Sequence, residues 1–380
     1  MTLKPPAQPL QLSLGGQRIA AFDFGTVTTR LLIAEVGSIG IHELLRETQI
    51  THMGQDLDST GVISLEAIQR VLKTCRKYLA CAAAHAEEQQ VKLVAVGTSA
   101  FRDAQNSDEL LQALSQLGIQ PRIVTGAEEA RLSFLGALSG FEIDDLEDKK
   151  GTVLLCPAQS GGSYGRLSSG HKRTVPFLSS NILVVDIGGG STELIAGEMD
   201  TGHKDANAAS NWASDLAQSS IRQSHSFNIG ARRLTERYLH SDPPKASELD
   251  DARQFTRTLL APWFKELEEQ AWGIDHIIAV AGTATTVVSI RDNMVTYDPQ
   301  KVHGSSVSLS ELKAANEQLC SLPLSKRQQV VGLEPARASV VIGGLLILEI
   351  VLELAGIDHY IASESDILRG IIFDAWESAN

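Results

Sequence analysis

The stretch LVVDIGGGSTELIAG, residues 183–197, decides the fold. Apolar residues typical of a buried strand run into Asp186, three glycines follow, and a second apolar run begins after Ser191, Thr192 and Glu193. Taken alone, the glycines could serve only the turn of a tight β-hairpin. A carboxylate at the end of a buried strand, beside backbone without side chains, is also typical of a ligand site in which the amides of the turn converge.

A second stretch near the N-terminus repeats this plan. IAAFDFGTVTTRLLIAEV (19–36) and ILVVDIGGGSTELIAGEM (182–199) both read apolar strand, Asp, apolar residue, Gly, small polar residues, apolar strand. Solenoid repeats have periods of about 20–50 residues, so this longer distance indicates a duplicated α/β unit. Two matching turns also favour a ligand site over two unrelated hairpins.

The residue types in the two turns indicate phosphate and a cation. The glycines, Gly188 to Gly190, can form a nest of amides that binds phosphate. Hydroxyl groups that can donate to phosphate oxygens are supplied by Thr26, Thr28, Ser191 and Thr192. A carboxylate repels phosphate, so Asp23 and Asp186 predict a metal ion between them and the ligand, usually Mg²⁺. No Walker or dinucleotide-binding pattern is present.

Composition limits the partners that we expect. A chain of 380 residues predicts two domains, and a net charge of -13 excludes a general attraction to nucleic acid or to an anionic membrane. The longest apolar run, 340–356, contains Glu349 and Glu353 and predicts a core helix. With no signal-peptide pattern and four cysteines in no metal-binding spacing, the chain is expected to be cytoplasmic.

Strand and helix patterns alternate along most of the chain. Residues 1–17 predict a loose polar tail, and 143–180 and 199–224 predict surface insertions. Two helices have predicted N-caps, Ser64 and Ser107. After the strand that begins at 276 we expect a loop and then a helix, up to residue 290.

Two stretches after predicted strands carry charged side chains. GTSAFRDAQN (97–106) offers Arg102, whose guanidinium suits a phosphate, although a surface pair with Asp103 is an alternative. TGAEEARL (125–132) places Glu128 and Glu129 at a helix start, where ordinary capping is the alternative.

Two further stretches fit a phosphate site. In AVAGTATTVV (279–288), the small residues Gly282 and Thr283 allow a ligand to approach closely, although plain strand–helix packing is an alternative. ARRLTER (231–237) predicts a basic track for a polyanion, or else a solvated helix face, through Arg232, Arg233 and Arg237.

Together these stretches resemble the exopolyphosphatase/guanosine pentaphosphate phosphohydrolase family, a branch of the actin-like superfamily. The similarity extends over most of residues 18–370 and includes VGLEPARASVVIGGLLIL (331–348). It implies an α/β fold of two actin-like (ribonuclease H-like) domains with an interdomain cleft. The first implied domain comprises residues 18–127 plus about 362–380, and the second comprises 128–361. The C-terminal helix of the chain thus packs on the first domain.

The resemblance also implies the chemistry. It implies a protein that releases terminal orthophosphate from inorganic polyphosphate in a Mg²⁺-dependent reaction. Guanosine pentaphosphate is the alternative substrate at the same site, and the protein is a candidate homodimer. Glu129 would orient or deprotonate the attacking water, while Asp186, Glu193 and Asp23 would belong to the metal site. The implied phosphate contacts are Gly25, Thr26, Thr28, Arg30, Arg102, Gly188, Gly189, Gly190, Ser191, Arg232, Gly282 and Thr283.

Departures from the family pattern keep other interpretations open. Val27 stands where the family usually has Asn in a Ser-Asn-Ser turn. The chain also ends without the extra C-terminal helical domains of long exopolyphosphatases, which predicts a preference for shorter phosphate chains or nucleotides. The alternatives are an actin-like ATPase or sugar kinase, and a catalytically lapsed protein that senses phosphate polymers.

Overall fold

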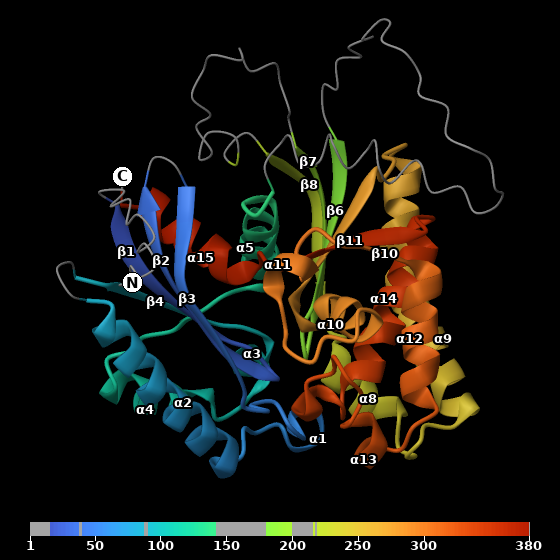
Figure 1. Ribbon diagram of the computed structural model, residues 1–380, viewed down its shortest axis with the longest axis horizontal. Helices are drawn as coiled ribbons and strands as arrows, with labels where there is room; N and C mark the ends of the chain where they lie inside the picture. The colour runs from blue at the N-terminus through green and yellow to red at the C-terminus, as the bar shows by residue number, and fades with distance from the viewer. Residues whose placement is uncertain are drawn as a thin grey trace, which may run out of the picture.

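Two β-sheets with helices between and around them form the computed structural model (Figure 1). It describes residues 16–37, 40–86, 90–141, 180–199, 216 and 219–379. Nearly all of the predicted tail and of the predicted insertion at 143–180 lies outside the described residues.

The first sheet has the strand order β3-β2-β1-β4-β5. Its strands are β1 (Gln17–Phe24), β2 (Thr28–Gly37), β3 (Gly40–Ile50), β4 (Lys92–Gly97) and β5 (Arg122–Ile123). β1 is antiparallel to β2 and parallel to β4. Alternate residues of β1, such as Phe22 and Phe24, pack against α2 (Leu65–Ala84) on the outer face.

The second sheet has the order β10-β11-β9-β6-β7-β8. Its strands are β6 (Ser180–Ile187), β7 (Thr192–Met199), β8 (Ser220–Phe227), β9 (His276–Val280), β10 (Ser306–Ser308) and β11 (His359–Ser363). β6 is antiparallel to β7 and parallel to β9, so the β6–β7 hairpin repeats the β1–β2 hairpin. The repeated sequence plan therefore corresponds to a repeated topology.

Two helices, α5 (Gly126–Leu138) and α15 (Ile367–Glu377), lie between the sheets (Figure 1). Their apolar residues share one core with the facing sides of both sheets. They cross closely: a Cβ added at Gly370 would overlap the carbonyl oxygen of Leu132, and one added at Gly136 would overlap that of Asp366. The glycines are required because the two helix backbones touch.

The remaining helices surround these layers. They are α1 (Leu57–Thr60), α3 (Ser99–Asp103), α4 (Ser107–Gln116), α8 (Ala231–Tyr238), α9 (Ala246–Glu269), α10 (Ala281–Arg291), α11 (Pro299–Val302), α12 (Leu309–Cys320), α13 (Leu324–Arg327), the 3₁₀ turn η1 (Pro335–Arg337) and α14 (Val341–Ala355). The apolar run at 340–356 is a buried helix, as predicted. Within the described residues, no helix combines the length and apolarity needed to cross a membrane.

Some local expectations differ from the structure. The helix α4 is preceded by Asn106 rather than capped by Ser107, whereas Ser64 caps α2 as predicted, accepting from the amide of Ala67. β8 already begins at Ser220, so the end of the predicted insertion at 199–224 is a strand. No loop separates β9 from α10, because Ala281 makes the turn in a left-handed conformation with φ of 64°.

Candidate functional site

The strands β1 and β6 end at one shared pocket, and the alternation of their side chains explains why. Asp23 lies on the same face of β1 as Ala21, which belongs to the core between the sheets. Asp186 likewise shares a face of β6 with Val184, from the same core. Since side chains two residues apart point the same way, both carboxylates point toward the space between the sheets.

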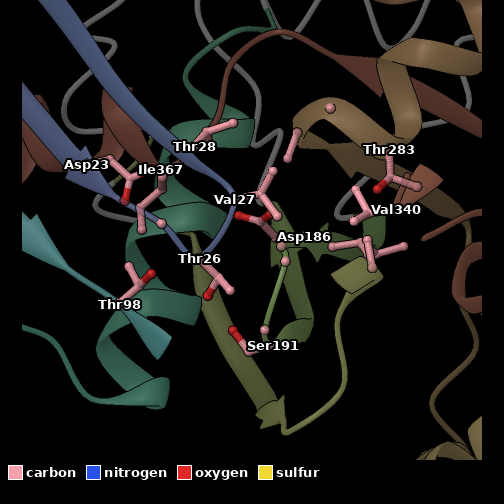
Figure 2. Close-up of a pocket in the computed structure, with 18 of the residues that line it drawn as sticks. Asp23, Thr26, Val27, Thr28, Thr98, Asp186, Ser191, Thr283, Val340 and Ile367 are labelled. Atoms are coloured by element: carbon pink, nitrogen blue, oxygen red, sulfur yellow. The ribbon is translucent and has the colours of Figure 1, made fainter. Parts of the chain in front are cut away.

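The turns after these aspartates have the same hydrogen bond. The amide of Gly25 donates to the carbonyl of Thr28 at 2.9 Å, and the amide of Gly188 donates to that of Ser191 at 3.0 Å. All the residues of these two turns line one pocket. In Figure 2, Asp23 and Ile367 lie on one side of this pocket and Thr283 and Val340 on the other.

The two turns also touch each other. A Cβ added at Gly189 would overlap the Val27 side chain, and one added at Gly190 would lie 2.7 Å from the hydroxyl of Thr26. The glycines therefore allow the turns of two different sheets to meet, in addition to baring their own amides. Val27 fills this contact with an apolar side chain that is 8% exposed.

Four carboxylates line the pocket, and each is at least 93% buried: Asp23, Glu129, Asp186 and Glu193. Asp186 and Glu193 are direct cross-strand neighbours on β6 and β7. Glu129 comes from the first turn of α5, where Thr125 and Glu128 form a capping box. The capping alternative therefore holds for Glu128, which leaves Glu129 free to face the pocket.

Burial makes these carboxylates hard to ionise. It raises the pKa of Glu129 to about 7 and that of Asp186 to about 6, against the attraction of Arg102 and Arg30 respectively. Burial, together with the charges of Glu129 and Asp186, raises the pKa of Glu193 as well. Such a cluster needs a cation to hold all its charges at neutral pH.

The predicted residue Arg102 lies behind the pocket rather than on its wall. Its Nη1 donates to Glu129 Oε2 at 2.6 Å and to the carbonyl of Val124 at 3.0 Å. It is not among the lining residues, and it does not pair with Asp103 as the alternative required. Arg102 is thus placed to orient Glu129, and its predicted contact with a phosphate stays a prediction.

The predicted contact Arg232 is also absent from the pocket wall, and the predicted basic track is neutralised. Arg232 pairs with Glu236 at 2.9 Å and contacts His52, while Arg233 pairs with Asp58 at 3.2 Å. Further pairs join Arg233 to Asp103 and Arg237 to Asp58. These side chains of α8 are occupied by partners, most of them from the first sheet's half, because the two halves meet here.

Sequence reasoning missed Arg337, which is among the residues that line the pocket. Within the described part of the chain, its guanidinium has no hydrogen bond or ion pair, and burial lowers its pKa. The guanidinium packs on the start of α10, where a Cβ added at Gly282 would overlap it. The stretch 331–348 was matched to the family, but no local pattern marks this arginine as part of a site.

The other predicted residues come together as expected. Of the predicted catalytic, metal and phosphate residues, those that line this pocket are Asp23, Gly25, Thr26, Thr28, Arg30, Glu129, Asp186, Gly188, Gly189, Gly190, Ser191, Glu193, Gly282 and Thr283. Arg30 holds Asp23 through Nε, at 2.8 Å from Oδ2, and also pairs with Asp366. Arg30 is therefore a partner of Asp23 at the end of β1 and of Asp366, the N-cap of α15, as well as part of the pocket wall.

The carboxylates fit a magnesium ion. Among the residues that the structure describes, no three His, Cys, Asp or Glu side chains form a ready-made metal-binding group. Mg²⁺ is usually held by one or two carboxylates and keeps several waters, so such a group is not required. Asp23 Oδ1 is buried without a hydrogen-bond partner among the described residues, an oxygen that a cation or its water would satisfy.

Replacing Asp186 by Asn should stabilise the metal-free protein. The raised pKa of Asp186 means that its ionised form is costly in the folded protein. The stability that this carboxyl contributes is therefore fully present at pH values below its ordinary pKa of 3.8, and it is lost as the pH rises through about 6. At pH 8 we expect Asp186→Asn to raise the free energy of unfolding by roughly 2 kcal/mol in chelator. Denaturant unfolding at pH 4 and pH 8 checks this, and equal differences at both pH values would contradict it.

The comparisons with known proteins agree with this geometry. The model of the Ppx/GppA phosphatase family matches residues 32–148 and 165–379. Exopolyphosphatase 2 of Mycobacterium tuberculosis is 33% identical over 371 residues, which cover 93% of this chain and 97% of that protein. A bifunctional 3-dehydroquinate synthase/phosphatase of Fusobacterium nucleatum is 30% identical over 369 residues, 94% of this chain and 46% of that protein.

Solved structures share the architecture. An exopolyphosphatase-like protein superposes with a TM-score of 0.72 at 30% identity, covering 96% of this chain and 99% of that one. An exopolyphosphatase from Cytophaga hutchinsonii has the same fold, with a TM-score of 0.72 at 24% identity over 95% of this chain and 98% of that one. The predicted α/β fold class and the predicted family are thereby confirmed, and the chain belongs to the Ppx/GppA phosphatase family.

Proposed function

We propose that this protein hydrolyses inorganic polyphosphate with Mg²⁺ and releases terminal orthophosphate by attack of water. The observation that carries the proposal is Glu129, a buried carboxylate on the wall of a pocket formed by two glycine turns. The family supports a phosphate ester or anhydride as substrate, and the relatives named exopolyphosphatase support polyphosphate in particular.

Glu129 would act as the general base. A carboxylate with a pKa of about 7 can accept a proton from the attacking water at neutral pH, whereas one with an ordinary pKa would be a weaker base. The hydrogen bond from Arg102 to Oε2 fixes the carboxylate, so that its other oxygen, Oε1, is the one offered to the water. Positioning of this kind is most of what phosphoryl transfer requires from a protein.

Asp186 and Glu193, with Asp23, would hold the Mg²⁺, which supplies charge neutralisation at the phosphate oxygens when bound. The amides of Gly189 and Gly190 would hold the terminal phosphate, since the amide of Gly188 is used within the turn, with the hydroxyls of Thr26, Thr28 and Ser191 beside them. Val27 lines the same pocket and packs against Gly189, so it places an apolar surface beside these donors.

The inner phosphates of the chain would run toward α10. This helix begins in the pocket with Gly282 and Thr283, and the amides of a helix N-terminus attract anions. Arg337 stands beside these amides with its guanidinium unpaired among the described residues. An unpaired cation next to bare amides suits a second phosphate group.

Replacing Arg337 by Ala should weaken polyphosphate binding. Losing a charged hydrogen-bond donor to phosphate should lower kcat/KM about 10- to 100-fold, mainly through KM. Arg337→Lys should recover part of the loss, because it keeps the charge but not the fork of donors. Arg76→Ala, which removes the same charge from the exposed face of α2, is the matched control. Equal KM values for Arg337→Ala and Arg76→Ala would exclude Arg337 from the substrate path.

Phosphate release by the purified protein tests the function. Polyphosphate of short and long chain length and guanosine pentaphosphate are compared with Mg²⁺ and with chelator, using Glu129→Ala as the inactive control. Release from polyphosphate that requires Mg²⁺ and Glu129 is the expected result. Faster release from guanosine pentaphosphate would reassign the substrate, and no release from either by the folded protein would leave a phosphate-binding, non-hydrolytic role.

A further inference from the structure

Two buried serines hold carboxylates of the pocket from behind. The hydroxyl of Ser133 donates to Asp186 Oδ2 at 2.7 Å, and that of Ser226 donates to Glu193 Oε1 at 2.6 Å. Both acceptors line the pocket, but neither serine is among its lining residues. The serines therefore lie on the protein side of the carboxylates and cannot be explained as ligand contacts.

The sheet and α5 together produce this arrangement. Asp186, Glu193 and Ser226 are cross-strand neighbours in one row over β6, β7 and β8, so their side chains emerge side by side. The row packs against α5, which carries Glu129 and, one turn later, Ser133 on the same side of the helix. One helix thus supplies both the proposed base and a hydroxyl that holds Asp186.

The hydrogen bond of Ser133 is unusual for a buried helical hydroxyl. Such groups commonly return to the carbonyl four residues earlier, and in this protein Thr74, Thr235 and Thr256 do so. Ser133, which is fully buried, instead donates to a carboxylate of another element. A hydroxyl has a single proton, so this donation fixes Asp186 at the expense of the local alternative.

We propose that Ser133 and Ser226 are positioning residues, which set the orientation in which Asp186 and Glu193 meet the Mg²⁺ of the site. With Oδ2 of Asp186 occupied by Ser133, Oδ1 is the oxygen through which this carboxylate binds a ligand of the pocket. Groups that orient metal ligands in this way typically contribute about 10- to 100-fold to metal affinity. The inference rests on the metal-assisted hydrolysis proposed above.

Metal binding without turnover tests this inference. Mn²⁺ serves as the probe, and its dissociation constant is measured by electron paramagnetic resonance on the full chain without substrate and with tripolyphosphate. We expect Ser133→Ala and Ser226→Ala each to raise it about 10- to 100-fold, and Ser226→Thr, which keeps the hydroxyl, to stay close to wild type. The matched control is Ser289→Ala, which removes a buried hydroxyl that donates only to backbone carbonyls of Thr286 and Gly332.

Kinetics give a second readout. The activity lost in Ser133→Ala should return at high metal concentration, with the KM for polyphosphate unchanged. The proposal is overturned if both alanine variants bind Mn²⁺ like Ser289→Ala, or if wild type binds no Mn²⁺ with or without tripolyphosphate. A wild type that binds Mn²⁺ but releases no phosphate would refute the proposed hydrolysis alone, since the binding experiment does not depend on turnover.

Discussion

Glu129→Gln should lower kcat for phosphate release from polyphosphate about 10²- to 10⁴-fold, the usual contribution of a general base. Glutamine has the same shape and its amide oxygen can still accept from Arg102, but it cannot take a proton from water. The wild-type kcat/KM should rise with pH through about 7, because the base is active only when ionised, and this limb should be missing in the variant. Stopped phosphate-release assays from pH 5.5 to 9 measure both.

Glu128→Gln is the matched control for this prediction. Glu128 is the preceding residue on α5, but it is only half-buried, and its carboxylate accepts a hydrogen bond from the amide of Thr125 in the capping box. Glutamine also serves in a capping box, so the change should be nearly neutral. If Glu128→Gln and Glu129→Gln had equal activity, or if Glu129→Gln kept the pH limb, another group would have to be the base.

Gly370→Ala should destabilise the protein by about 3 kcal/mol or more, at the upper end of overpacking effects. The added Cβ would overlap the carbonyl oxygen of Leu132 and lie 2.7 Å from its carbon, so both obstacles are backbone. Relief requires α5 and α15 to move apart, and the core between the sheets opens with them. Because α5 carries Glu129, activity should fall even at temperatures where the variant is folded.

Urea unfolding of Gly370→Ala beside Gly273→Ala measures this effect. Gly273 has open space around its would-be Cβ and no left-handed backbone, so its substitution should change stability by less than about 0.5 kcal/mol. A midpoint for Gly370→Ala that matched Gly273→Ala would show that the helix crossing can relax without cost. An unchanged kcat in the folded Gly370→Ala variant would show that the packing of α5 against α15 does not determine the position of Glu129.

The turns of the site were predictable because their chemistry is local. Asp, Gly and small hydroxyl residues lie within a few positions of one another, and the period of two along a strand determines the face from which each aspartate points. The family resemblance then identified Glu129, which no local rule separates from Glu128. The structure adds that Glu128 caps the helix while its neighbour enters the pocket.

The arginines were harder to predict, because a guanidinium takes its role from partners that are distant in sequence. Both Arg102 and Arg232 were expected at a phosphate. In the structure Arg102 binds Glu129 and Arg232 contacts His52, partners that no local pattern could indicate. Arg337 shows the reverse: it lies in a short 3₁₀ turn with no pattern, and it is the arginine left unpaired in the pocket among the described residues. Strand β3 was also missed, since its alternation of apolar and charged residues is irregular.

The placement of α15 bears on how the protein is made. This helix packs against α5 and against β1, β2 and β4, the strands at the centre of the first sheet. On the ribosome, those strands emerge long before residues 367–377, with the whole second sheet synthesised in between. The inner face of the first sheet must therefore remain uncovered during most of translation, and the site between the sheets can be completed only after the helix encoded last has docked.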